Sequence, residues 1–160
     1  MRACIQRVRK ANVIVGAESV GQIGHGLLVF LGVSQGDTQR EVDTLAEKIA
    51  GLRIFDDADG KMNLSVLDVG GTVLVVSQFT LLADCRKGKR PSFIDAAPPA
   101  LAEQLYLMLI DKLKLLGVPT AHGRFRANMQ VELTNDGPVT IILDTQEFCR
   151  SDHNRHQIEH

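Results

Sequence analysis

Alternation of hydrophobic and polar residues predicts several strands in the first third of the chain. The segments with this pattern are "CIQRV" (4–8), "NVIVG" (12–16) and "ESVGQIG" (18–24), the last two joined by a Gly16-Ala17 turn. "GLLVFLGV" (26–33) is apolar throughout, which predicts a strand buried on both faces.

Four more strands are predicted farther along the chain. They are "LRIF" (52–55), "TVLVVSQF" (72–79), "RANMQVEL" (126–133) and "VTIILD" (139–144). The second is apolar enough to be the central buried strand. The turn sequence "TNDGP" separates the last two, so we expect two strands there.

Two segments have the period of an amphipathic helix. Residues 37–52 place an apolar stripe on one face, formed by Val42, Leu45, Ala46 and Ile49. Thr38 and Glu41 have the spacing of a capping box, and Gly51 is suited to end this helix. Residues 98–117 begin with two prolines, end in glycine, and direct a second stripe to the core, formed by Leu101, Leu105, Met108 and Leu109.

The order of these elements indicates the fold class. Strands outnumber helices and occur both in hairpins and around two helices, which predicts an α/β domain with a mixed, barrel-like sheet and helices packed on one side. No GxGxxG or Walker motif is present. We expect one domain over residues 1–150 and a polar, disordered tail over 151–160.

Composition limits the function classes. The chain has 160 residues and a formal net charge of −1, so any nucleic-acid binding must come from a local basic patch and not from the whole surface. No apolar stretch approaches the length of a signal peptide core or a membrane span. We therefore expect a cytoplasmic protein with no membrane partner.

The cysteines and histidines predict neither a disulfide framework nor a metal site. Cys4, Cys85 and Cys149 are far apart and form no Cys-x-x-Cys pair. The tail histidines could bind a metal only if the tail were helical, and "DDADGK" (56–61) lacks the distal glutamate of a calcium loop. We expect no metal and no cofactor.

The end of the central strand carries unusual chemistry. On an extended strand, Ser77 and Phe79 would share one face, and Gln78 and Thr80 the other. Thr80 could be a nucleophile only if a base activated it, and no histidine or aspartate is adjacent in sequence. The stretch alone favours an ordinary polar strand end over a reaction site.

Two further segments have alternative interpretations. Arg86, Lys87, Lys89 and Arg90 form a basic loop, which suits either solvent exposure or contact with phosphates. "NDGPVT" (135–140) is a hairpin turn by composition, but its proline cannot donate to a sheet and tolerates a cis bond.

Taken together, these segments resemble the D-aminoacyl-tRNA deacylases, the D-Tyr-tRNA(Tyr) deacylase family. "SQFTLLAD" and "NDGPVT" carry the resemblance, supported by "IQRV", "VGQIGHGLLVFLGV", "LAEKIAGLRIF", "GKMNLSV", "RKGKRPSF" and "ILDT". It covers residues 1 to about 147. The resemblance implies a homodimeric hydrolase that binds the 3′ acceptor end of tRNA and not DNA. The reaction implied is hydrolysis of the ester of D-aminoacyl-tRNA, and of glycyl-tRNA mischarged on tRNA(Ala), in chirality proofreading.

The resemblance also implies roles for individual residues. Ser77, Gln78, Phe79 and Thr80 would form the catalytic pocket, with RNA-assisted catalysis, and Ala102 and Met129 would lie near it. A cis Gly137-Pro138 pair would enter the partner subunit's pocket and reject L-amino acids, and Arg7 would hold that pair in place. The basic loop would contact tRNA.

Two positions depart from the family pattern, which reads Thr-Gly-x-Phe-Gly-Ala before the last hairpin. His122 replaces the threonine, and Arg126 replaces the second glycine. Arginine has less freedom than glycine at positive φ. Two rival functions are a non-catalytic tRNA-binding module and a threonine-nucleophile hydrolase of small esters.

Overall fold

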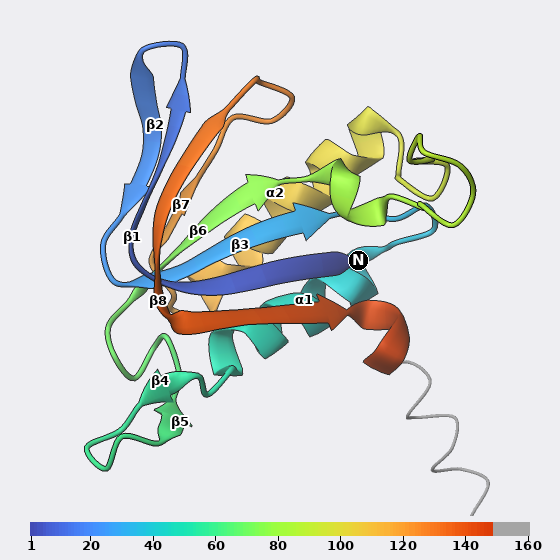
Figure 1. Ribbon diagram of the computed structural model, residues 1–160. Coiled ribbons are helices and arrows are strands. Elements are labelled where there is room, and N and C mark those ends of the chain that lie inside the picture. Colours follow the sequence, from blue (N-terminus) through green and yellow to red (C-terminus); the bar gives the residue numbers. More distant parts are fainter. Residues whose placement is uncertain (149–160) are drawn as a thin grey trace, which may run out of the picture.

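Two long strands run side by side along almost their whole length in the computed structural model, which describes residues 1–148 (Figure 1). They are β1 (Arg2–Val15) and β8 (Gln130–Asp144), and they pair antiparallel. The other edge of β1 is shared, because β3 (Gly26–Gly32) pairs with its first half and β2 (Glu18–Ile23) with its second.

The sheet continues from β3 with parallel strands. β6 (Thr72–Ser77) pairs with β3, and β7 (Thr120–His122) pairs with β6, giving the order β2-β1-β3-β6-β7. A separate hairpin contains β4 (Phe55–Asp56) and β5 (Met62–Leu64). The sheet is therefore mixed, as predicted.

Each parallel pair is connected through a helix on one face of the sheet. α1 (Gln39–Gly51) follows β3, and α2 (Pro99–Leu115) follows β6 (Figure 1). The predicted capping box is present, since the Thr38 hydroxyl accepts from the helix backbone and Glu41 accepts from the Thr38 N–H. The two helices pack side by side.

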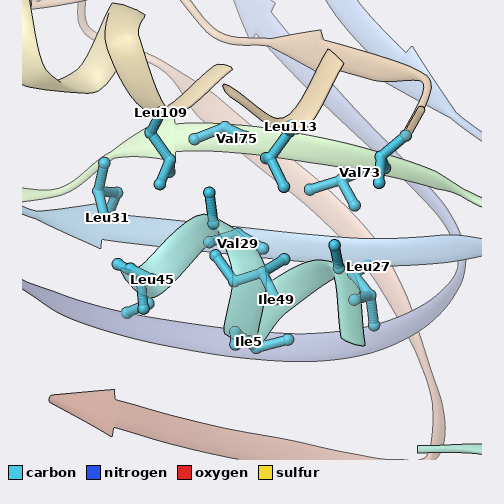
Figure 2. Close-up of a cluster of buried hydrophobic side chains, with 14 of the residues drawn as sticks. Ile5, Leu27, Val29, Leu31, Leu45, Ile49, Val73, Val75, Leu109 and Leu113 are labelled. Carbon is cyan, nitrogen blue, oxygen red and sulfur yellow. The ribbon is translucent and has the colours of Figure 1, made fainter. Parts of the chain in front are cut away.

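The main core lies between this helical layer and the sheet. Figure 2 shows Val29, Leu45, Ile49 and Leu109 converging there from the sheet and both helices. Alternate residues of the central strands, such as Leu28 and Leu74, point into a second cluster on the opposite face. The prediction that residues 26–33 are buried on both faces is therefore confirmed.

The second cluster is covered because the sheet curls over it. The β1–β8 register shifts near Val8, and the outer halves of both strands bend over the face opposite the helices. β2 then approaches β7 so closely that a Cβ added at Gly21 would lie 2.4 Å from the carbonyl oxygen of His122. The sheet is thus a nearly closed barrel-like layer with helices on one side, and the predicted fold class is correct.

Some predicted boundaries were wrong. The segments 4–8 and 12–15 belong to one strand, β1, and not to two, and β8 continues through the "TNDGP" segment, because both halves of each strand pair with the same long neighbour. β7 was missed because three residues are too few to show a period. The expected strand at 52–55 reduces to Phe55. No helix within residues 1–148 is long and apolar enough to cross a membrane, and both the predicted tail and Cys149 lie outside the described residues.

Candidate functional site

The polar end of β6 does not continue as a strand. Ser77 is its last residue, the Gln78 N–H donates to the Leu31 carbonyl at 2.8 Å, and Phe79–Leu82 form a 3₁₀ turn. The alternation expected of an extended strand therefore does not continue beyond Ser77, because the chain bends at Gln78 with ψ of 83°. Tight turns of this kind aim consecutive side chains in directions that a strand cannot.

A cavity of about 670 Å³ opens beside this turn. Ser77, Gln78 and Phe79 line one side, Ala102 of α2 lines another, and Met129 lies just before β8. The fold thus gathers five predicted site residues from three regions of the chain. Most of the remaining wall is apolar, and the Phe79 and Phe93 rings meet edge to face, 5.0 Å between centroids.

Thr80 lies apart from the cavity wall. Its side chain is exposed, and its hydroxyl accepts a hydrogen bond from the Gln78 side-chain amide. Among the described residues, no backbone carbonyl accepts from the N–H groups of Phe79 or Thr80 at the start of the turn. Two unpaired donors and a nearby hydroxyl suit a group that develops negative charge.

Several lining residues were not predicted. Phe93, Ala97 and Phe125 come from loops that carry no periodic pattern. Arg126 was placed in a predicted strand, but β8 begins only at Gln130, so Arg126 lies in the loop before it.

Phe125 packs against Tyr106, with 5.8 Å between the two ring centroids. The Tyr106 hydroxyl donates to the Val75 carbonyl. Burial raises the pKa of the Tyr106 hydroxyl, so this group stays a neutral donor.

Arg126 occupies the position where the family pattern has glycine. Its φ is 63°, and Arg126 alone among the described non-glycine residues has a positive φ. The expectation that this position demands a glycine-like backbone is therefore met, and arginine adopts the conformation nevertheless.

Arg7 holds the Gly137-Pro138 segment. The buried guanidinium donates from Nε to the Asp136 carbonyl at 2.8 Å and from Nη1 to the Ile54 carbonyl at 2.7 Å. The Asn135 side chain braces the same turn, accepting from the Val139 N–H at 2.8 Å and donating to the Val139 carbonyl at 3.1 Å. This backbone is therefore tied at both ends.

The Gly137-Pro138 bond is cis, as the resemblance implied. Both residues are exposed, and neither lines the cavity of its own chain. The structure therefore brings the "SQF" residues together with Ala102 and Met129, but it does not bring Gly137 and Pro138 to them within one subunit.

The basic loop contains one paired and three unpaired cations. Arg86 contacts Asp84 through two side-chain hydrogen bonds of 2.9 and 2.7 Å, which lowers the pKa of the Asp84 carboxyl to about 2. Lys87, Lys89 and Arg90 are exposed and have no carboxylate within ion-pair distance in the described chain. These three charges are free to meet an anion.

No group of three potential metal ligands occurs among the described residues. The tail histidines lie outside them. The cavity therefore offers hydroxyl, amide and backbone donors as its polar groups, together with Arg126.

Comparison with known proteins gives consistent matches. A family model described as D-Tyr-tRNA(Tyr) deacylase matches residues 4–144. A D-aminoacyl-tRNA deacylase of Desulforudis audaxviator is 58% identical over 148 residues, which are 92% of this chain and 99% of that protein. One from Geobacter sulfurreducens is 58% identical over 151 residues, covering 94% and 99%.

Solved structures share the fold. One named c-Myc DNA Unwinding Element Binding Protein superposes with a TM-score of 0.86 at 44% identity, covering 90% of this chain and 98% of that one. A probable eukaryotic D-amino acid tRNA deacylase has a TM-score of 0.76 at 16% identity, covering 89% and 98%. The second likeness concerns the fold alone.

Proposed function

The chain belongs to the D-Tyr-tRNA(Tyr) deacylase family, a family of hydrolases, and from this premise we propose that it hydrolyses the ester bond of D-aminoacyl-tRNA. The products are a free D-amino acid and tRNA. The observation that carries the proposal is the cavity at the end of β6, where Ser77, Gln78 and Phe79 meet Ala102 and Met129.

The chemistry requires placement more than a strong nucleophile. An aminoacyl ester is already reactive, and its ribose carries a 2′-hydroxyl beside the acyl group. A water molecule positioned by that hydroxyl attacks the carbonyl carbon, and the bond from that carbon to the ribose oxygen breaks. The proton of the water passes to the ribose oxygen. Phe79 lines the cavity, and its unpaired N–H group is suited to stabilise the transient oxyanion.

Gly137 and Pro138 serve as the chiral filter in this proposal. A main-chain wall that clashes with every L side chain rejects the whole class at once, whereas glycine has no side chain to clash. Support comes from the bracing by Arg7 and Asn135, which fixes the wall. Because these residues are exposed and remote from their own cavity, we place them in the cavity of a second subunit. The enzyme is then a homodimer with shared active sites.

The basic loop is the proposed contact for the acceptor end of tRNA. Lys87, Lys89 and Arg90 are exposed and unpaired within the described chain, and Arg86 is oriented by Asp84. The cell compartment follows from the substrate, since charged tRNA is used in the cytoplasm. Proofreading of D-residues and of glycine mischarged on tRNA(Ala) is the corresponding role.

The decisive experiment measures deacylation of matched D-tyrosyl-, L-tyrosyl- and glycyl-tRNA by the purified protein. We expect cleavage of the first and third and not of the second. Ala102→Trp, which fills the cavity, should abolish cleavage, while Leu107→Trp on the exposed face of α2 should not. Binding of tRNA without any cleavage would instead support the non-catalytic module.

A further inference from the structure

Arg126 is the one ionisable side chain among the described residues that line the cavity. Its neighbours there include Phe125, Ala127 and Met129, which offer it no negative charge. Arg126 is exposed although it lines the cavity, and no carboxylate of the described chain lies within ion-pair distance of it. A guanidinium in this position is unpartnered until a ligand enters.

The adjacent Arg124 provides the contrast. It lies two residues earlier on the same loop, does not line the cavity, and pairs with Glu18 at 3.6 Å. The loop therefore carries one arginine that the protein itself neutralises and one that it leaves free beside the cavity.

The backbone conformation at Arg126 is a second reason to assign its side chain a function. A φ of 63° disfavours any residue with a Cβ relative to glycine. Residues in sparsely populated backbone conformations cluster at active sites and ligand sites. A side chain that binds a ligand would explain why arginine and not glycine occupies this position.

We propose that Arg126 binds an anionic group of the substrate at the cavity and so contributes to substrate binding. This inference rests on the proposed deacylase function. The planar guanidinium presents parallel N–H donors that match a phosphate or a carboxylate. The anion we favour is the phosphate on the 5′ side of the terminal adenosine, because it lies one ribose away from the ester and every tRNA carries it.

A side-chain carboxylate is the second source of the same chemistry. A D-aspartyl or D-glutamyl group would bring its own anion into the cavity. The two sources predict different patterns: a phosphate contact acts on all D-aminoacyl-tRNAs, whereas a carboxylate contact acts on the acidic ones alone.

The experiment compares Arg126→Gln with the matched control Arg124→Gln, using D-tyrosyl- and D-aspartyl-tRNA. Glutamine keeps a Cβ and most of the side-chain length, so Arg126→Gln removes the charge without changing the backbone demand. With a phosphate contact, kcat/KM should fall about tenfold for both substrates, with the loss mainly in KM. The slope of log kcat/KM against log salt concentration should be smaller in magnitude by about 0.7 for Arg126→Gln than for wild type.

A smaller substrate pair isolates the phosphate. Wild type should hydrolyse the D-tyrosyl ester of adenosine 5′-monophosphate faster than that of adenosine, and Arg126→Gln should remove the difference. A loss confined to D-aspartyl-tRNA would assign the contact to the carboxylate. Equal behaviour of Arg126→Gln and Arg124→Gln on every substrate would overturn the proposal.

The test remains informative if the deacylase function fails. In that case wild type cleaves no D-aminoacyl-tRNA, and calorimetry with adenosine 5′-monophosphate and with adenosine replaces the rate measurement. A preference for the phosphorylated ligand that disappears in Arg126→Gln upholds the anion contact, and its absence refutes it.

Discussion

At the scale of single residues, the role of Thr80 separates two mechanisms. Its hydroxyl is exposed, contacts the Gln78 amide, and has no histidine or carboxylate partner in the described chain. Without a base it is not activated as a nucleophile. We therefore expect Thr80→Ala to keep deacylation within about tenfold of wild type, the loss of one hydrogen bond of roughly 1 kcal/mol.

Single-turnover assays with D-tyrosyl-tRNA measure this effect, and Thr80→Ser is the control that retains the hydroxyl. Complete inactivation of Thr80→Ala, together with a trapped acyl-Thr80 in wild type, would show that the hydroxyl attacks directly. The hypothesis that Thr80 is the nucleophile would then be correct.

Asp84 gives a prediction in pH. The Arg86 contacts lower the pKa of its carboxyl to about 2, from 3.8. Because the carboxyl pKa is lower in the folded protein than in the unfolded chain, the ionised carboxylate stabilises the folded loop at pH values above the unfolded pKa. This contribution is lost as pH falls from about 4 through 2. NMR titration should find this pKa near 2, and Arg86→Ala should raise it toward 3.8. An unchanged pKa in the variant would show that Arg86 is not the cause.

At the scale of elements, the basic loop is expected to act as a unit. Lys87→Ala with Arg90→Ala should weaken tRNA binding and reduce the log–log salt slope by about 0.7–0.9 per lost phosphate contact. Filter binding at several salt concentrations measures both. The control is Lys114→Ala, an exposed cation at the end of α2. A salt slope equal to that of wild type would show that the loop makes no phosphate contact and is only exposed to solvent.

The junction of β1, α1 and β8 depends on one buried ion pair. The Met1 amino group contacts Asp37 at 2.9 Å and Thr145 at 2.7 Å, and Asp37 also accepts from the Ser34 N–H. Asp37→Asn leaves a buried ammonium without its counter-charge, so we expect a loss of about 3 kcal/mol in the free energy of unfolding.

Urea denaturation measures this loss. Asp43→Asn removes the partner of Lys112 on the helix surface, a pair 3.8 Å apart, and should change stability by less than about 0.5 kcal/mol. If the two variants were equally stable, the junction would not depend on charge.

Prediction from sequence succeeded where an element has enough length to show a period. The stripe of α1 and the double burial of β3 are of this kind, and both are confirmed. Boundaries set by pairing were missed: β8 passes through "TNDGP" because β1 supplies partners on both sides of it. The turn at Phe79 was missed for a similar reason, since nothing in "SQFT" records where β3 stops pairing.

For the candidate site, the motif residues were predicted from sequence, but the loop residues that complete the cavity were not. Motif residues such as Ser77 and Met129 were found through the resemblance, and the fold gathers them. Phe93 and Phe125 were missed because loop residues reach the cavity through tertiary packing, which leaves no periodic signal.

At the scale of the whole molecule, the proposed site is incomplete in one chain. Gly137 and Pro138 are exposed and do not line their own cavity, so we expect a homodimer in which each cavity receives them from the partner. Light scattering should give twice the chain mass. Deleting residues 151–160 should leave both the dimeric state and the activity unchanged.

Subunit mixing tests the shared site directly. Ala102→Trp fills the cavity of its own chain, and Gly137→Ala places a Cβ 2.7 Å from the Val139 side chain at a φ of 146°, which displaces the segment. Each variant alone should be inactive, Ala102→Trp because its own cavity is filled and Gly137→Ala because the displaced segment obstructs the partner's cavity. Refolded together at equal amounts, half of the dimers are mixed, and each mixed dimer has one intact cavity facing one intact Gly137-Pro138 segment. Activity should therefore recover to about a quarter of wild type, as two-fold symmetry requires. If the mixture stayed inactive while mass spectrometry showed mixed dimers, each site would be built from a single chain.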